Sequence, residues 1–241
     1  MPPSAITVGV LALQGGVVEH IALLNRASTS YPSTTFHFLE VRTPEQLSLC
    51  DALIIPGGES TTMAIVARRL GLLEPLREFV KINNRPVWGT CAGLVMLAEQ
   101  ASATKQGGQE LIGGLDVRVL RNKFGTQVQS FVADLKLDFL GEGEGPFRGV
   151  FIRAPVVEEV INGNGSGNVK VLGTVKKPGE EADIVAVRQG NVFGTSFHPE
   201  LTGDVRVHVW WLGNVVEALS QRRKERGLVV GSGKNDAVEA A

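Results

Sequence analysis

The sequence is short of three things that would point to particular classes of protein: cysteine, surplus charge and long apolar runs. Two cysteines in 241 residues cannot build the disulfide framework of a small secreted domain. Lys and Arg number 24 against 25 Asp and Glu, so no overall field would gather nucleic acid or anionic lipid. The first apolar run, residues 6–13, is too short to span a bilayer, and no basic segment precedes it as in a secretory signal. We therefore expect no nucleic-acid or membrane partner and a reduced, cytoplasmic compartment.

The composition that remains is ordinary for a globular domain. Hydrophobic residues make up 43% of the chain and charged residues 20%. A chain of this length suits one domain with a substantial core, which we expect over residues 1–226. Residues 227–241 are small, polar and aperiodic, which predicts a disordered C-terminal tail.

Up to about residue 102, the sequence alternates between strand and helix patterns. The continuous apolar residues 6–13 predict a strand buried on both faces of a parallel sheet. Val17, Ile21 and Leu24 follow at helical spacing. The alternation continues with strands expected at 36–41, 51–55 and 85–89, and helices at 61–69, 73–82 and 92–101. This order predicts a doubly wound α/β domain with a mostly parallel sheet.

Beyond residue 102, helical patterns give way to a run of short strand-like segments, which predicts antiparallel additions to the sheet. These segments are residues 115–120, 127–135, 150–152, 169–175, 184–187 and 192–197. Val205, Val209 and Leu212 then begin a closing helix, whose basic end at residues 222–226 (RRKER) suits a helix C-terminus better than a nucleic-acid site. The glycine-rich residues 162–168 (NGNGSGN) do not fit a phosphate-binding motif and predict a loop.

Cys91 lies where the strand at 85–89 is expected to turn into a helix, in the stretch GTCAGL. A helix N-terminus favours an anion, and the thiolate is the nucleophilic form of cysteine. Gly89 and Gly93 flank the thiol at the spacing of a nucleophile elbow, where only small neighbours fit the sharp turn. These residues alone support a catalytic thiol and an inert thiol in a tight corner equally. Cys50 has no such setting, and we expect it to be a small buried hydrophobe.

Among the four histidines, His198 has the setting of a general base. It directly follows the strand at 192–197, at the carboxyl end where open α/β sheets bind their ligands. Pro199 stiffens the turn, and Glu200 could orient the imidazole ring. His198 is thus the candidate partner for Cys91.

The other histidines have plainer settings. His20 is expected to be solvated or partly packed, His37 to lie on one face of a strand, and His208 to lie on the surface of the closing helix. No clustering of cysteine and histidine indicates a metal site.

Residues 56–60 (PGGES) end a strand and begin a helix. Glycines at such a turn let backbone N–H groups point into the ligand crevice. Donors of this kind form an oxyanion hole, and removing one costs about 3–4 kcal/mol in known enzymes. The same residues also suit a tight turn with Ser60 as the helix N-cap, and the two roles are compatible.

Taken together, residues 56–60 (PGGES), 89–94 (GTCAGL) and 197–200 (FHPE) resemble the class I, triad-type glutamine amidotransferases, which have a flavodoxin-like fold. The resemblance is closer still to the glutaminase subunits of pyridoxal 5′-phosphate synthase, the PdxT or SNO type. It spans residues 6–219, and its further blocks are 9–15 (GVLALQG), 56–63 (PGGESTTM), 121–127 (RNKFGTQ), 149–155 (GVFIRAP) and 195–201 (TSFHPEL). Residues 29–34 and 162–181 look expanded relative to the short bacterial pattern, but they interrupt none of these blocks.

The resemblance implies a catalytic triad of Cys91, His198 and Glu200. Cys91 would attack the side-chain amide carbon of glutamine and form a γ-glutamyl thioester. His198 would activate the thiol and then protonate the leaving ammonia, while Glu200 holds its ring. By the same resemblance, the substrate-binding residues would be Gly58, Glu59, Ser60, Arg121, Ile152 and Arg153, and the oxyanion hole would use Gly58 and Ala92.

The resemblance also implies a partner but no cofactor and no metal. Ammonia would pass to a separate synthase subunit, a TIM barrel that makes pyridoxal 5′-phosphate, and Gln14 would lie at the interface with it. Free subunits of this family have an incompletely formed oxyanion hole, so the partner is expected to raise glutaminase activity. Two rival interpretations stay open: the glutaminase of another pathway, such as histidine biosynthesis, and a catalytically silent subunit that only organises the synthase. Keeping Cys91, His198 and Glu200 argues against a silent subunit.

Overall fold

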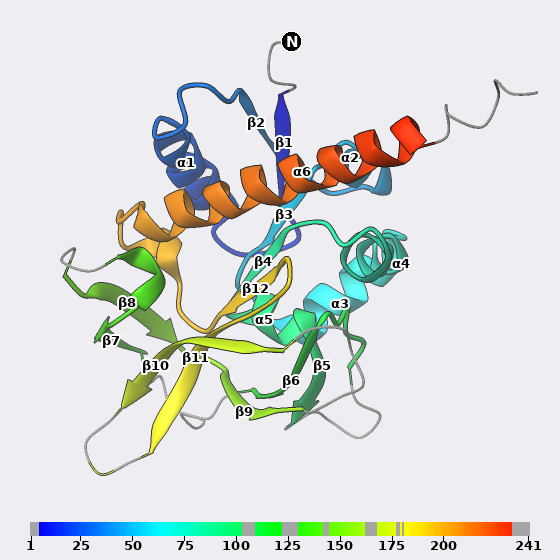
Figure 1. The fold of residues 1–241 in the computed structure, drawn as a ribbon. Coiled ribbons are helices and arrows are strands. Elements are labelled where there is room, and N and C mark those ends of the chain that lie inside the picture. Colours follow the sequence, from blue (N-terminus) through cyan, green and yellow to red (C-terminus); the bar gives the residue numbers. More distant parts are fainter. Residues whose placement is uncertain are drawn as a thin grey trace, which may run out of the picture.

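The computed structural model describes residues 5–102, 109–121, 130–141, 145–161, 168–176, 179 and 181–232, with side chains of the last segment as far as residue 225. One large sheet runs through the molecule in the order β2-β1-β3-β4-β12-β11-β9-β6-β5, and β10 pairs with β11 (Figure 1). A two-stranded ribbon, β7-β8, forms a second sheet.

Half of the large sheet is a parallel core, as the alternating pattern predicted. Its strands are β2 (Phe36–Val41), β1 (Ile6–Leu11), β3 (Ala52–Ile55), β4 (Val87–Thr90) and β12 (Val192–Thr195), all mutually parallel. The sequences of β3 and β4 are buried at every position, because helices cover both faces of the sheet.

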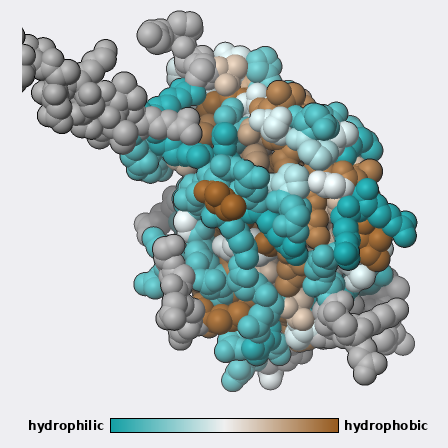
Figure 2. All heavy atoms as spheres, turned by 90° about the vertical axis from the view of Figure 1, so that its right-hand side faces the viewer, coloured by the Kyte–Doolittle hydropathy of each residue, from teal (hydrophilic) through white to brown (hydrophobic). Residues whose placement is uncertain are grey.

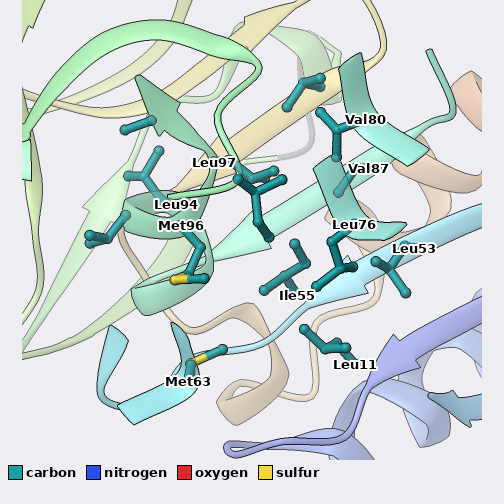
Figure 3. Close-up of a cluster of buried hydrophobic side chains, with 14 of the residues drawn as sticks. Leu11, Leu53, Ile55, Met63, Leu76, Val80, Val87, Leu94, Met96 and Leu97 are labelled. Atoms are coloured by element: carbon teal, nitrogen blue, oxygen red, sulfur yellow. The ribbon is translucent and has the colours of Figure 1, made fainter. Parts of the chain in front are cut away.

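Successive side chains of these strands alternate between two hydrophobic clusters. Ile54 and Trp88 lie in one cluster with residues of α1 (Val17–Ser28) and α6 (Arg206–Ser232). Leu53 and Ile55 lie in the other, which Figure 3 shows together with Met63, Leu76 and Leu94. The helices that supply this second cluster are α3 (Ser60–Arg69), α4 (Leu73–Arg77) and α5 (Ala92–Leu97). On the face shown in Figure 2, hydrophobic side chains lie in separate patches among hydrophilic ones, as is usual for a globular surface.

The other half of the sheet contains the predicted antiparallel additions. Antiparallel pairs join β12 to β11 (Ala182–Gln189), β11 to β9 (Val156–Val160) and to β10 (Lys170–Lys176), and β9 to β6 (Leu115–Leu120). The ribbon of β7 (Ser130–Leu135) and β8 (Phe147–Ile152) is antiparallel as well. The strand β9 is missing from the sequence-based prediction, because its pattern VVEEV is short and only half apolar.

The helix predicted over residues 92–101 is wrong in its second half. α5 ends at Leu97, and the chain continues as the strand β5 (Ala98–Ser102), parallel to β6. Its sequence AEQAS suits a helix by propensity, but pairing with β6 overrides that weak preference. The helix predicted over 73–82 is interrupted too, because α4 passes into a π-helical turn, η1 (Glu78–Ile82).

The closing helix α6 runs to Ser232, past its expected end at Arg226 and into residues 227–232 of the predicted C-terminal tail. Residues 233–241, which complete that predicted tail, lie outside the described residues, as do most of the predicted loop at 162–168 and residues 127–129 of a predicted strand. The remaining elements are α2 (Pro44–Ser48) and the single turns η2 (Asp138–Leu140) and η3 (Pro199–Leu201).

Candidate active site

The carboxyl ends of β1, β3, β4 and β12 open on a cavity of about 780 Å³. A parallel sheet brings these ends to one edge, where ligands of α/β proteins bind. Every residue predicted from the sequence to act in catalysis, substrate binding or the subunit interface lines this cavity: Gln14, Gly58, Glu59, Ser60, Cys91, Ala92, Arg121, Ile152, Arg153, His198 and Glu200.

Cys91 stands at the sharp turn between β4 and α5. Its φ is 50° and its ψ is −106°, a conformation that strains a residue with a side chain. The neighbouring glycines are required by space: a Cβ on Gly93 would lie 2.0 Å from the Ile55 carbonyl oxygen, and one on Gly89 would lie 2.4 Å from the Gly93 backbone. The Cys91 N–H donates to the Thr195 carbonyl oxygen at 2.8 Å, which fixes the turn against β12. The local sequence therefore builds a nucleophile elbow.

His198 and Glu200 approach this thiol from the end of β12. The Nδ1 of His198 lies 2.8 Å from Glu200 Oε1, which leaves Nε2 for Cys91. The His198 N–H donates to the Val150 carbonyl oxygen at 2.8 Å, so β8 fixes the backbone that carries the ring. A Cβ on Gly57 would lie 2.5 Å from His198 Cε1, so the glycine lets the imidazole sit against the main chain.

Electrostatics favour a charged imidazole ring beside the thiol. Burial alone would lower the pKa of His198, but its hydrogen bonds to Cys91 and Glu200 raise this pKa well above the ordinary value. Burial alone would raise the pKa of Glu200, and its contacts with His198 and His20 lower it instead. At neutral pH the carboxylate is therefore ionised and supports an imidazolium next to the nucleophile.

Glu59 organises a second group of residues that line the cavity. Its carboxylate accepts hydrogen bonds from the N–H groups of Thr61 and Thr62, so Glu59 caps α3. Burial alone would raise the pKa of Glu59, but the hydrogen bond from the Thr62 hydroxyl, together with those from the backbone N–H groups, lowers it to about 2. Arg121 Nη2 lies 2.8 Å from Glu59 Oε1, and the Glu59 N–H donates to Gln14 Oε1 at 2.8 Å. A fixed anion and a cation thus face the cavity side by side.

Ser60, Ile152 and Arg153, which were also predicted to bind substrate, line the same cavity as Glu59 and Arg121. Ser60 is buried, and its Oγ donates to Gln109 Oε1 at 3.0 Å. Ile152 ends β8, and its carbonyl oxygen lies 4.0 Å from Cys91 Sγ. Arg153 follows with a φ of 45°, at the point where the β7-β8 ribbon returns to the sheet. The end of β8 and the residue after it therefore form part of the cavity wall.

Comparison with known proteins identifies the family. The model of the SNO glutamine amidotransferase family matches residues 10–217. The chain belongs to this family. In sequence it is 49% identical to a probable pyridoxal 5′-phosphate synthase subunit PDX2 of Arabidopsis thaliana, over 86% of this chain and 85% of the relative. It is also 46% identical to the pyridoxal 5′-phosphate synthase subunit PdxT of Nocardia farcinica, over 91% of this chain and 90% of the relative.

A solved structure gives the same result for the fold of this SNO family member. A protein described as a glutamine amidotransferase superimposes with a TM-score of 0.69 at 42% identity, covering 86% of this chain and 98% of that one. The predicted α/β fold with its mostly parallel sheet is confirmed. Within the described ranges, no cluster of three or more metal-ligating side chains occurs and no helix is long and apolar enough to cross a membrane.

Two histidines of this SNO chain lie where the sequence did not place them. The predictions of a solvated or partly packed His20 and a surface His208 are wrong: neither side chain has any exposed surface. Val205 and Val209, which were predicted to mark the buried face of the closing helix, are only half-buried. The fully buried face of α6 instead includes their neighbours Val207 and His208. A stripe centred on His208 and Trp211 would have been the sequence signal for this burial.

Proposed function

We propose that this chain is the glutaminase subunit of a pyridoxal 5′-phosphate synthase and hydrolyses L-glutamine to L-glutamate and ammonia. The observation that carries the proposal is the placement of Cys91, His198 and Glu200 in one cavity, with the thiol on a strained elbow and its base oriented by a carboxylate. The names of the PDX2 and PdxT relatives support the choice of synthase.

In the proposed reaction, the Cys91 thiolate attacks the side-chain amide carbon of glutamine and forms a C–S bond. The amide oxygen takes the negative charge, and the backbone N–H groups of Gly58 and Ala92 stabilise it. The imidazolium of His198 then gives its proton to the leaving nitrogen, so ammonia departs and a γ-glutamyl thioester remains. Water, deprotonated by His198, attacks the thioester and releases glutamate and the thiolate.

The rest of the cavity suits the amino-acid end of glutamine. The ionised carboxylate of Glu59 is a partner for the α-ammonium group, and Arg121 beside it is a partner for the α-carboxylate. Ser60, Ile152 and Arg153 line the same space, and the carbonyl oxygen of Ile152 reaches the region of the thiol. Substrate bound in this way places its side-chain amide at Cys91.

Ammonia protonates in water, so its use in synthesis needs direct transfer to a second catalytic centre. We propose a pyridoxal 5′-phosphate synthase subunit, a TIM barrel, as the partner, with Gln14 at the interface. Gln14 Oε1 holds the Glu59 N–H, and a Cβ on Gly58 would lie 2.7 Å from the same oxygen. A partner that contacts Gln14 therefore acts directly on the segment that carries an oxyanion donor.

Adding the purified synthase subunit should raise ammonia release from glutamine by about 10²-fold, the usual effect of one oxyanion-hole donor. The measurement is a glutaminase assay with and without the partner, with pyridoxal 5′-phosphate formation followed in the same reaction. Replacing Gln14 with alanine should remove most of the activation. Equal turnover with and without partner would contradict the coupling, and stimulated ammonia release with no pyridoxal 5′-phosphate would assign the chain to another synthase.

A further inference from the structure

The triad continues beyond Glu200 into a row of buried histidines that the proposed reaction does not use. Glu200 Oε1 is engaged by His198, but Oε2 is buried and has no hydrogen-bond partner within the described residues. His20 Nε2, from α1, lies 3.4 Å from Oε2. His20 Nδ1 in turn lies 3.0 Å from His208 Nε2, on α6. His198, Glu200, His20 and His208 thus form one continuous row.

The contacts favour one assignment of protons along this row, because the reverse one, with the Thr90 hydroxyl donating to His20 Nε2, would leave the buried Glu200 Oε2 with no donor. A carboxylate oxygen only accepts, so the His20 nitrogen facing it, Nε2, carries the proton. In a neutral ring the other nitrogen, Nδ1, is then an acceptor, and His208 Nε2 must donate to it. In this assignment, His208 Nδ1 carries no proton. It also has no hydrogen-bond partner in the described part of the chain. The two agree, because a buried acceptor without a partner costs less free energy than a buried N–H without one.

The surroundings keep both rings neutral. Neither histidine has exposed surface, and burial lowers the pKa of each to about 3. Trp88 packs edge-on against both rings, with centroids 5.8 Å from His20 and 4.9 Å from His208. Thr90 Oγ1 lies 3.5 Å from His20 Nε2. Among the described residues, the titratable groups that act on His20 are Glu200, His208 and His198. Glu19 also approaches Glu200, since a Cβ on Gly16 would lie 3.3 Å from Glu19 Oε2 and 3.2 Å from Glu200 Oε1.

We propose that His20 and His208 are positioning residues that hold the second oxygen of Glu200, so that its first oxygen stays on His198 Nδ1. A neutral donor suits this task better than a cation. A charged His20 would compete with His198 for the negative charge of Glu200, whereas a neutral N–H orients the carboxylate and leaves the charge for the imidazolium. His208 acts one step further away, because its donated hydrogen bond selects the tautomer of His20.

The kinetic consequence of this proposal rests on the proposed glutaminase function, but the proton assignment does not. Long-range ¹H–¹⁵N correlation on the wild-type full chain reads the state of each histidine nitrogen directly. The chain has four histidines, and single His→Gln variants assign their signals. We expect His20 and His208 to be neutral at pH 7 with the proton on Nε2. A proton on His20 Nδ1, or a doubly protonated His20, would overturn the proposal whatever the activity of the enzyme.

The second arm compares His20→Leu with His20→Gln in the glutaminase assay with partner present. His20→Leu removes the donor, and we expect a 10- to 10²-fold lower kcat with little change in KM, the usual effect of a lost hydrogen bond to a charged group. The acid limb of the kcat/KM profile should move to higher pH, because Glu200 then takes up a proton more readily. The side chain of Gln has an N–H near the position of the histidine Nε2. His20→Gln should therefore have a kcat and a pH profile of kcat/KM close to those of the wild type.

The matched control is His37→Leu, which removes a histidine from an exposed position on β2 and should leave kcat and the pH profile unchanged. His208→Leu should give a smaller loss than His20→Leu, in the same direction. A His20→Leu enzyme with the wild-type pH profile would contradict the proposal. So would a loss in kcat that Gln and Leu share equally, because it would indicate a packing role.

Discussion

Cys91→Ala should abolish glutamine hydrolysis, with kcat reduced by at least about 10⁴-fold, while the protein keeps its fold. The reaction as proposed has no alternative nucleophile, since the thioester cannot form without the sulfur. The thiol is almost fully buried, with 6% of its surface exposed, but it ends a short side chain, so truncation leaves only a small void. The measurement is ammonia release from glutamine, with circular dichroism and thermal unfolding reporting on the fold.

Cys50→Ala is the matched control for this variant. Cys50 is also buried, at 2% exposure, and burial raises the pKa of its thiol to about 12, so it is an inert packing group as the sequence predicted. Its truncation should lower stability by about as much as Cys91→Ala and leave ammonia release unchanged. If Cys91→Ala retained hydrolysis, or if Cys50→Ala lost it, the assignment of the nucleophile would be wrong.

Stability should fall on mild acidification, by roughly 3 kcal/mol between pH 7 and pH 5, because two histidines buried in neutral form together lose roughly 4 kcal/mol and His198 offsets part of that loss. The pKa of His20 and of His208 is lowered from 6.5 to about 3 by burial. The unfolded chain takes up both protons below pH 6.5, whereas the folded chain takes them up only near pH 3. The stabilisation is therefore fully present above pH 6.5 and is lost as the pH falls toward 3. His198 acts in the opposite sense, because its raised pKa keeps it charged in the folded protein while the unfolded chain protonates it only below about pH 6.5. Its contribution offsets roughly 1 kcal/mol of the loss between pH 7 and pH 5.

Urea unfolding at a series of pH values between 7 and 5 measures this loss. His208→Leu should reduce the loss between pH 7 and pH 5 by roughly 2 kcal/mol, since one of the two buried neutral histidines is gone, whatever it does to stability at pH 7. His37→Gln, at an exposed position, should keep the wild-type slope. An unchanged slope in His208→Leu would contradict the assignment, because it would show that His208 takes up its proton at the same pH in the folded and unfolded chain.

The parallel core could be predicted from sequence because most of its strands are short apolar runs, and β1, β3 and β4 are each followed by a glycine turn or a helix. The cavity could be predicted for the same reason. Residues 56–60, Cys91 and His198 all follow such runs directly, and parallel strands bring their carboxyl ends together. That inference does not require knowing which distant residues pair, because a parallel sheet brings the carboxyl ends of its strands to one edge in any case.

The errors occur where a distant partner decides the local structure. Residues 98–102 form a strand because β6 pairs with them, and nothing within the segment indicates that pairing. His208 is buried because α6 turns Val207, His208 and Trp211 toward Trp88. The apolar residues Val205 and Val209 have a similar helical spacing, so the sequence alone did not distinguish the two faces as candidates for burial. The hydrogen bond between His20 and His208 joins residues 188 positions apart, so no local pattern could reveal it.

The positive φ of Cys91 affects how this protein can change under selection. Glycine adopts such a conformation freely, whereas a side-chain-bearing residue there costs on the order of 1–3 kcal/mol. A selection for heat resistance alone would therefore favour glycine at this codon and produce robust but inactive proteins. Only continued demand for glutamine hydrolysis keeps cysteine in place, so any stabilisation campaign on this chain needs an activity screen in every round.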